Sequence, residues 1–202
     1  MNRIKCVREF RLSSKRKQTL KMAKVPFLFG EIRQPSTSML VIPKVSSEKR
    51  RYLPIGFVQS EVIVSGSALI IPDANSYLFG ILTSNVHNSW MRMVAGRMKS
   101  DYQYSKNVVY NNFPWPKPTA EQKAAIEQTA QGILAARALY PDASLADLYD
   151  ELTMPPELRK AHQNNDRAVM TAYGFNWRKM TESDCVAELM KLYQKLVSEN
   201  NV

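Results

Sequence analysis

The stretch FPWPKPTAEQ, residues 113–122, divides the chain into two parts with different sequence patterns. Three of its first six residues are proline, which cannot continue a helix or a central strand because it lacks a backbone amide proton. Thr119 and Gln122 then stand at the spacing of a capping box, in which each side chain accepts a hydrogen bond from the other's backbone amide. The stretch therefore predicts a boundary near residue 118 and a helix directly after it.

Upstream of this boundary, short runs of Val, Ile, Leu and Phe alternate with turn signals, a pattern typical of β-strands. We expect strands at residues 25–32, 38–45, 52–58, 62–71 and 107–110. Residues 76–95 differ, because their apolar side chains recur at intervals of three and four, which predicts one amphipathic helix. Asp73 or Asn75 is placed to cap the start of that helix, and Gly96 is placed to end it in a left-handed conformation.

Downstream of the boundary, every periodic stretch is helical. Ser144 can cap a short helix through Tyr149, Pro156 can open a longer helix that ends at Gly174, and Thr181 can cap the last one. The inner face of the last helix should carry Val186, Leu189, Met190, Tyr193, Leu196 and Val197.

The expected fold class is α+β. We predict a basic linker or helix at residues 1–24, a β-rich domain with a packed helix at 25–118, and a small all-α domain at 119–202.

The net charge differs on the two sides of the same boundary. Residues 1–118 hold 19 Lys and Arg against 6 Asp and Glu, a balance of +13, whereas residues 119–202 hold 9 against 12, a balance of −3. A basic half beside a weakly acidic half favours contact of one half with a polyanion. Cys6 and Cys185 lie far apart without the spacing of a zinc site or a disulfide scaffold, which favours a reducing cytoplasm. No apolar run approaches the roughly 18 residues of a membrane span, so we expect no membrane partner.

The chemistry of a catalytic centre is absent from the sequence. It has no phosphate-binding loop, no glycine-rich cofactor turn and no Asn/Asp-Pro-Pro-aromatic motif. His87 and His162 stand alone, without a Cys or carboxylate at triad or metal spacing, so a structural role is the favoured interpretation. Cys185 has no identified base and is interpreted as a core residue. We therefore expect no catalytic residue, no metal ligand and no cofactor in this chain.

The segment GRMKSDYQYSK, residues 96–106, places cations, amides, hydroxyls and a carboxylate side by side. Lys99 can donate to guanine O6 and N7 and Asp101 can accept from cytosine N4, so the two could read one G·C pair, with Gln103 as a third base contact. Contacts to the DNA backbone are predicted for Arg97, Tyr104, Ser105 and Lys106. The alternative is a solvated polar loop that follows a helix.

A second basic group suits phosphate contact through its cations and hydroxyls. It comprises Lys44, Ser46, Ser47, Lys49, Arg50 and Arg51, and the N-terminal Arg8, Arg11, Lys15, Arg16 and Lys17 could act similarly. A solubilising surface is the alternative.

Several stretches resemble the target-recognition domain of MmeI-like type IIL restriction–modification enzymes, in the same order along the chain. These stretches are PFLFGE (26–31), IPKVSSEKRRY (42–52), YLFGILTS (77–84), RMKSDYQYS (97–105) and YNNFPWP (110–116). MPPELRKAH (154–162) and residues 169–175 are similar to the family's C-terminal helical segment. In that family, a pair of residues two apart before a Tyr-x-Tyr-Ser stretch is associated with the choice of one base pair, and Lys99 and Asp101 match that pair.

The resemblance implies a longer parent protein, with a nuclease domain, a helical connector and an adenine-N6 methyltransferase domain before this region. That parent would use S-adenosylmethionine and, for cleavage, Mg²⁺. For this chain we predict sequence-specific recognition of double-stranded DNA, which positions the duplex for base flipping by a methyltransferase domain on the same or a separate chain. Two alternatives remain: a protein–protein assembly module, supported by the acidic helical half, and a small RNA-binding protein.

Overall fold

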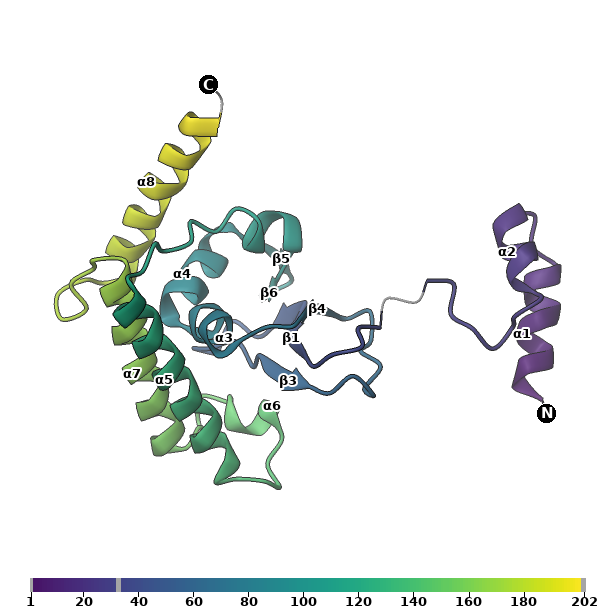
Figure 1. Cartoon of the computed structure of the whole chain (residues 1–202), viewed down its shortest axis with the longest axis horizontal. Helices are drawn as coiled ribbons and strands as arrows, with labels where there is room; N and C mark the ends of the chain where they lie inside the picture. Colours follow the sequence, from purple (N-terminus) through teal and green to yellow (C-terminus); the bar gives the residue numbers. More distant parts are fainter. Residues whose placement is uncertain (1, 32–33, 201–202) are drawn as a thin grey trace. The chain divides into compact units, whose positions relative to one another are not determined.

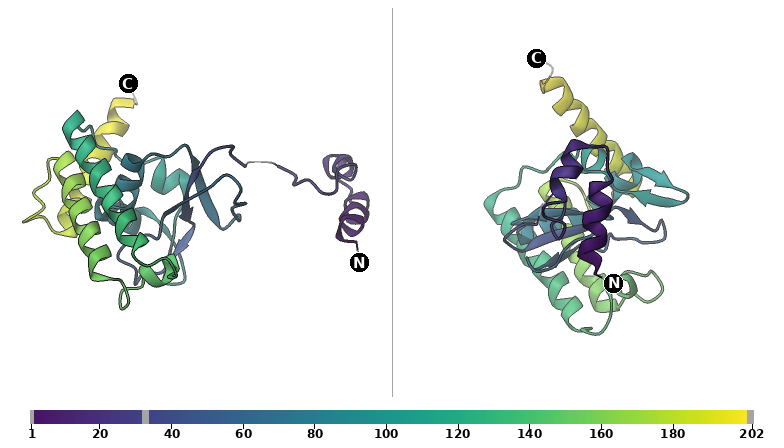
Figure 2. Two further views of the ribbon diagram at one scale, coloured as in Figure 1. Left: turned by 60° about the horizontal axis from the view of Figure 1, so that its bottom comes forward. Right: turned by 90° about the vertical axis from the view of Figure 1, so that its right-hand side faces the viewer.

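The computed structural model describes residues 2–31 and 34–200, and the chain falls into two compact units, Met1–Ser36 and Thr37–Val202. Figures 1 and 2 show the course of the chain through both units. The first unit holds two helices, α1 (Arg3–Leu12) and α2 (Lys17–Met22), and neither helix has a buried residue. The Arg11 guanidinium donates to the carbonyl oxygens of Met22, Val25 and Leu28 at 2.7–3.0 Å.

The strand expected at residues 25–32 is wrong for residues 25–31, which form turns, while Ile32 lies outside the described residues. The carbonyl groups of Val25 and Leu28 bond to Arg11 instead of a neighbouring strand. The large side chains of Phe27 and Phe29 are exposed, so in this unit no sheet face buries them.

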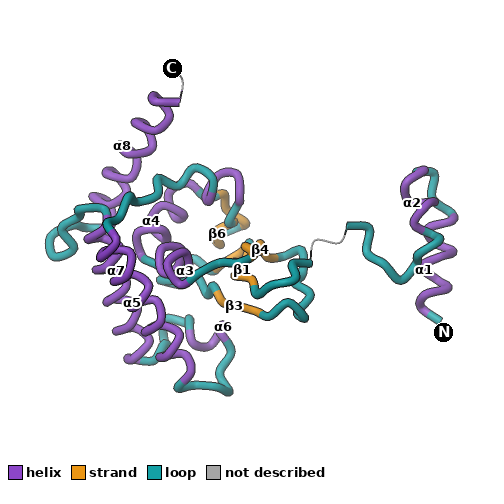
Figure 3. The backbone as a smooth tube through the Cα atoms, viewed as in Figure 1, coloured by secondary structure: helices purple, strands orange, loops and turns teal. Residues whose placement is uncertain are grey.

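The second unit contains two small antiparallel sheets (Figure 3). One sheet has the order β3-β1-β4 and consists of β1 (Met39–Pro43), β3 (Gly56–Val58) and β4 (Ala68–Pro72). The other has the order β2-β6-β5 and consists of β2 (Val45–Ser46), β5 (Gly96–Met98) and β6 (Asp101–Gln103). Three of the predicted runs thus overlap β1, β3 and β4, each of which is shorter than expected, whereas β5 and β6 lie where no strand was predicted.

The helix expected at residues 76–95 is two helices, α3 (Ser76–Thr83) and α4 (Asn85–Val94). Ser84 separates them: its backbone is extended, and its hydroxyl donates to the carbonyl of Ile81 at 2.7 Å and accepts from the amide of His87 at 3.3 Å. One serine therefore ends α3 and caps α4. The Asn75 cap is confirmed by its bond to the amide of Leu78 at 2.9 Å.

Two local predictions next to α4 are wrong. Gly96 has no left-handed conformation and begins β5. The strand expected at residues 107–110 is a π-helical turn, η1 (Lys106–Tyr110), in which Val109 is buried. The indole of Trp90 donates to the carbonyl oxygen of Val109 at 3.0 Å, so a side chain from the core takes the acceptor that a strand would have used.

The C-terminal helices are α5 (Ala120–Ala138), α6 (Leu145–Leu148), α7 (Pro156–Ala172) and α8 (Glu182–Asn200). The capping box of Thr119 and Gln122 is confirmed, as are the caps of Ser144 and Thr181. Gly174 follows α7 with a φ of +72°, a conformation in which glycine avoids the cost of a Cβ atom.

Helices α5 and α7 lie side by side and pack on α3, and α8 packs on α4 (Figures 1 and 2). Buried residues of the sheets, of α3 and α4, and of the C-terminal helices form one hydrophobic core. The inner face of α8 is confirmed at Leu189, which is fully buried, but Leu196 and Val197 are 37% and 39% exposed because the end of α8 extends past its neighbours. The α+β fold class with a helical C-terminal part is confirmed.

Candidate functional site

The polar segment 96–106 begins with a β-hairpin, β5 and β6, joined by Lys99 and Ser100. Residues opposite each other in an antiparallel pair share a face of the sheet. The register pairs Arg97 with Tyr102 and Met98 with Asp101. Asp101 therefore lies with Met98 on the outer face, whereas Arg97 lies with buried Tyr102 on the inner face.

The third strand of this sheet, β2, has one residue on the outer face and one on the inner face. Its Val45 lies opposite Gln103, and its Ser46 lies opposite Tyr102. Gln103 is exposed and lies opposite Gly96 in the register of the hairpin. The predicted base contacts Asp101 and Gln103 thus share the outer face, next to Lys99 at the tip.

Contacts of Arg97 on the inner face stabilise the hairpin. The Arg97 guanidinium stacks on the ring of Tyr102 at 3.9 Å, donates to the carbonyl of Ser100 at 2.6 Å, and pairs with Glu48 at 3.3 Å. The Arg97 side chain is 45% exposed, so part of it still faces solvent. Its position supports the shape of the hairpin in addition to the predicted phosphate contact.

Lys99 stands at the hairpin tip with a φ of +57°, in the left-handed region. A non-glycine residue pays roughly 1 kcal/mol for this conformation, and such residues concentrate at functional sites. Lys99 is exposed, and the strain has no compensation from burial. The lysine therefore costs stability at a position where glycine would fit.

This strain yields a prediction that separates folding from function. Lys99→Gly is expected to raise the free energy of unfolding by about 1 kcal/mol, because it removes the Cβ strain at the hairpin tip. Urea denaturation would measure the change, with Lys106→Gly as the control, since Lys106 has no positive φ. A loss of stability in Lys99→Gly would contradict the strain.

The second predicted group lies on the loop that leaves β2. Lys49 and Arg51 are exposed and Arg50 is half-buried, so all three cations are open to solvent at least in part. Ser46 is only 4% exposed and lies on the inner face, so its side chain does not reach the surface as a phosphate contact would require. Two further members are already engaged: Lys44 donates to the carbonyl of Gly66 at 2.7 Å, and the Ser47 hydroxyl accepts from the amide of Lys49 at 3.3 Å.

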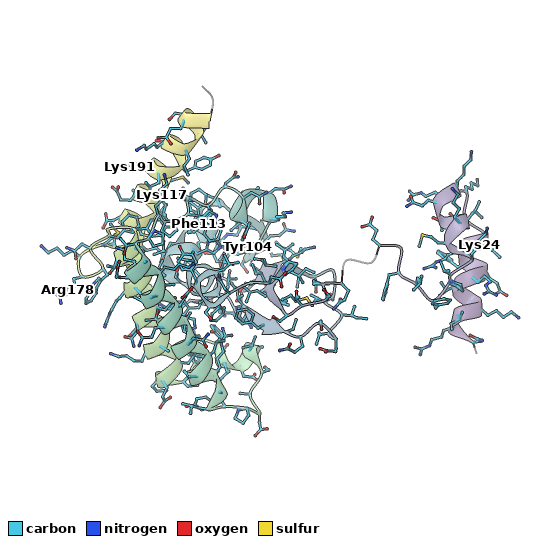
Figure 4. The ribbon with its side chains drawn as sticks, viewed as in Figure 1. Lys24, Tyr104, Phe113, Lys117, Arg178 and Lys191 are labelled. Carbon is cyan, nitrogen blue, oxygen red and sulfur yellow. The ribbon has the colours of Figure 1, made fainter. Side chains whose placement is uncertain are left out.

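Tyr104 lies in the core, and Figure 4 shows it in the interior of the second unit near Phe113. It is 2% exposed, and its hydroxyl lies 2.9 Å from Nε2 of His87. Burial lowers the pKa of His87 to about 3, which keeps the imidazole neutral, and burial raises the pKa of Tyr104. Tyr104 therefore does not offer its hydroxyl to DNA. The structural interpretation of His87 is confirmed.

Ser105 and Lys106 follow at the start of η1. The Ser105 hydroxyl accepts a hydrogen bond from the amide of Val108 at 3.4 Å, and Lys106 is exposed. Lys106 thus keeps its charge at the surface, whereas Ser105 serves first as a cap.

A buried anchor that no local sequence signal predicts lies beneath residues 46–51, which we call the basic loop. Asp166 of α7 accepts hydrogen bonds from the hydroxyl of Tyr52 at 2.6 Å and from the amide of Asn85 at 2.7 Å. Burial is the main cause that raises the pKa of Asp166 to about 6. Arg92 of α4 adds a second link, since it donates to Glu182 at 2.6 Å and to the carbonyl of Arg51 at 3.2 Å. These contacts join the loop to α4, α7 and α8.

A cavity of about 320 Å³ lies beside this anchor. Its lining includes Arg51, Asp166, Arg167, Trp177, Glu182 and Cys185. Cys185 is 4% exposed, and burial raises its pKa to about 12, so its interpretation as a core thiol is confirmed. His162 is also a core residue, stacked on Tyr52 at 4.1 Å with Nε2 2.6 Å from the hydroxyl of Tyr149.

Among residues 2–31 and 34–200, no group of three or more His, Cys, Asp or Glu side chains is arranged to hold a metal ion. Within the same residues, none of the helices has both the length and the apolar character needed to cross a membrane.

Comparison with known proteins places these features in a family. Residues 1–117 match the family model described as MmeI, target recognition domain, and residues 118–200 match MmeI, C-terminal domain. DNA methyltransferase A of Bacillus subtilis (strain 168) is 39% identical over 196 residues, which are 96% of this chain and 22% of that protein. A solved structure, described as the type IIL restriction–modification enzyme MmeI in complex with DNA, is 50% identical and superposes with a TM-score of 0.89.

That structural match covers 97% of this chain and 26% of the solved chain. The chain thus spans about a quarter of the length of these relatives. Because both family models match in order and together cover nearly all of the sequence, the chain belongs to the MmeI family, of which it carries the target recognition domain and the C-terminal domain.

Proposed function

We propose that this chain recognises a specific sequence in double-stranded DNA and carries no catalytic centre of its own. The observation that carries the proposal is the exposed hairpin of β5 and β6, with Lys99, Asp101 and Gln103 at its tip and on its outer face. Within the described residues, strand β2 pairs only with Tyr102 and Gln103, so the hairpin is two-stranded toward its tip. A two-stranded ribbon fits the major groove, which is about 12 Å wide. The match to a target recognition domain supports the same function.

The base contacts follow from the chemistry of these three side chains. Lys99 donates to guanine, Asp101 accepts from the cytosine of that pair, and Gln103 can bond bidentately to adenine. The outer-face register of Asp101 and Gln103 supports simultaneous contact with neighbouring base edges. A carboxylate in a basic surface weakens attraction to phosphates, so its position at the tip favours a role in base selection.

The basic loop contributes backbone contacts through Lys49, Arg50 and Arg51, with Arg97 and Lys106 near the hairpin. Such contacts orient a protein on the duplex without reading its sequence. Since they dominate affinity, binding by this chain alone is weak and strongly dependent on salt.

The whole protein, we further propose, is an adenine-specific DNA methyltransferase that uses S-adenosylmethionine, with Mg²⁺ for any DNA cleavage. The similarity to a DNA methyltransferase and to a restriction–modification enzyme supports the methyltransferase part of this assignment. The present chain would position the duplex for a methyltransferase domain outside its 202 residues.

Selection from a randomised duplex library at low salt, followed by sequencing, tests recognition. We expect the wild type to select a motif that contains a G·C pair, and the Lys99→Ala/Asp101→Ala variant to lose preference at that pair. A matched control is Lys49→Ala, which should weaken binding on all sequences alike.

Three outcomes would contradict the proposal in different ways. Equal selection by wild type and double variant would remove Lys99 and Asp101 from base readout. No DNA binding at low salt would favour the assembly module. Preference for single-stranded RNA or an A-form duplex would favour the RNA-binding alternative.

A further inference from the structure

Two arginines, Arg167 and Arg178, lie against the ring of Trp177. Trp177 and Arg178 belong to the loop between α7 and α8, residues 173–181. The Cζ atoms of Arg167, in α7, and of Arg178 lie 4.7 and 4.9 Å from the centroid of the Trp177 ring. All three residues are exposed, and Figure 4 shows Arg178 at the outer edge of the second unit. The two charges are therefore at most about 10 Å apart, close to one Debye length in physiological salt.

The neighbouring carboxylates bond to other residues. Asp166 and Glu182 line the cavity beside Trp177, and both already accept the hydrogen bonds described above. Within the described part of the chain, neither Arg167 nor Arg178 forms an ion pair. The aromatic ring holds two guanidinium groups at the surface without an internal anion, which is an arrangement suited to an external one.

The basic loop connects this site to the hairpin. At its start, Ser46 pairs with Tyr102 of β6, and at its end Arg51 lines the cavity that Trp177 also lines. The six residues from Ser46 to Arg51 are joined by five Cα–Cα steps, which span at most about 17 Å of extended chain. Cations continue along it at Lys49, Arg50 and Arg51. The arginines at Trp177 therefore lie at the far end of a basic track that begins at the hairpin.

We propose that Arg167 and Arg178 bind phosphates of the DNA backbone, so that the C-terminal helices extend the contact surface along the duplex. This inference rests on the proposed function, because it requires the hairpin and the basic loop to face DNA. Guanidinium–phosphate contacts are charge-assisted and bidentate, and they carry no base information. The stack on Trp177 keeps the guanidinium planes in place before DNA arrives, which lowers the entropy lost on binding.

The test measures the affinity for a fixed DNA duplex as a function of salt. For Arg167→Gln/Arg178→Gln, we expect the slope of log K against log salt to become shallower by about 1.8, since each phosphate contact contributes about 0.9. Affinity should fall about tenfold on every duplex while the selected motif stays unchanged. Arg167→Lys/Arg178→Lys keeps the charges and should retain the wild-type slope.

A matched control is Lys191→Gln/Lys195→Gln on α8, which removes the same charge at two exposed residues beside acids of their own helix. An equal change of slope in both glutamine variants would overturn the inference, because a general charge effect would explain it. A wild-type slope in the arginine variant, with the motif still selected, would overturn this inference alone. Absence of DNA binding by the wild type would overturn the proposed function as well.

Discussion

Gly80→Leu is expected to lower the free energy of unfolding by about 3 kcal/mol, because no space exists for a side chain at this point of α3. A Cβ atom at Gly80 would lie 2.8 Å from Cγ2 of Ile126 and 3.2 Å from Cβ of Ala130, both fully buried residues of α5. It would also lie 3.1 Å from Oδ1 of Asn165, whose amide donates to the carbonyl of Gly80 at 2.8 Å. The glycine thus permits close contact of α3 with α5 and α7.

Urea denaturation with a two-state analysis measures this loss. Gly132→Ala is the matched control, since Gly132 lies in α5 with nothing within 4 Å of its missing Cβ. The free energy of unfolding of Gly132→Ala should rise by up to about 1 kcal/mol, because alanine has a higher helix propensity than glycine. If Gly80→Leu proved as stable as the wild type, the close approach of the three helices would be wrong.

Asp166→Ala is expected to lower the free energy of unfolding by about 3 kcal/mol at pH 5. It leaves the Tyr52 hydroxyl and the Asn85 amide without their buried acceptor, and each unsatisfied group costs about 1–3 kcal/mol. Asp166→Asn is the control, because its amide can accept from Asn85 and donate to the Tyr52 oxygen. We expect Asp166→Asn to lower the free energy of unfolding by less than about 1 kcal/mol. Equal losses of stability in the two variants would rule out hydrogen bonding as the cause.

The same carboxyl makes stability depend on pH. Its folded pKa of about 6 lies above the ordinary value of 3.8, so the folded state holds this proton more tightly than the unfolded state. The stabilisation of the folded state by protonated Asp166 is therefore fully present below about pH 4, declines between pH 4 and 6, and is absent above that range. The difference in unfolding free energy between wild type and Asp166→Asn should follow this course, by about 2–3 kcal/mol in total. A constant difference across the range would show that the pKa of Asp166 is not raised.

Local signals predicted those parts of the fold whose contacts are close in sequence. The capping box at Thr119, the cap at Ser144 and the turn at Gly174 each depend on atoms within a few residues. The break at Ser84 was missed because the apolar stripe continues through it, and stripe periodicity does not distinguish one helix from two. The extended backbone and the capping bonds of Ser84 separate the two helices, and α3 then packs on α5 whereas α4 packs on α8.

In the candidate site, too, some features could be predicted from the sequence and others could not. The alternation of Asp101, Tyr102, Gln103 and Tyr104 was a readable signal, because residues two apart share a face. It could have assigned Tyr104 to the buried face together with Tyr102, as the structure does. No comparable signal marks Asp166, because its partners Tyr52 and Asn85 lie 114 and 81 residues away.

The amino-acid sequence alone determined the change of pattern after residue 118, the helix caps, the basic and acidic halves and the order of the family motifs. Each of these is a property of adjacent or regularly spaced residues. The tertiary structure alone decided that Arg97 braces the hairpin from its inner face. It alone joined the basic loop to α7 through Asp166 and brought Arg167 and Arg178 to one indole ring. Such contacts depend on which buried faces meet when the core closes, and apolar burial is non-directional, so the chain's local pattern does not specify them.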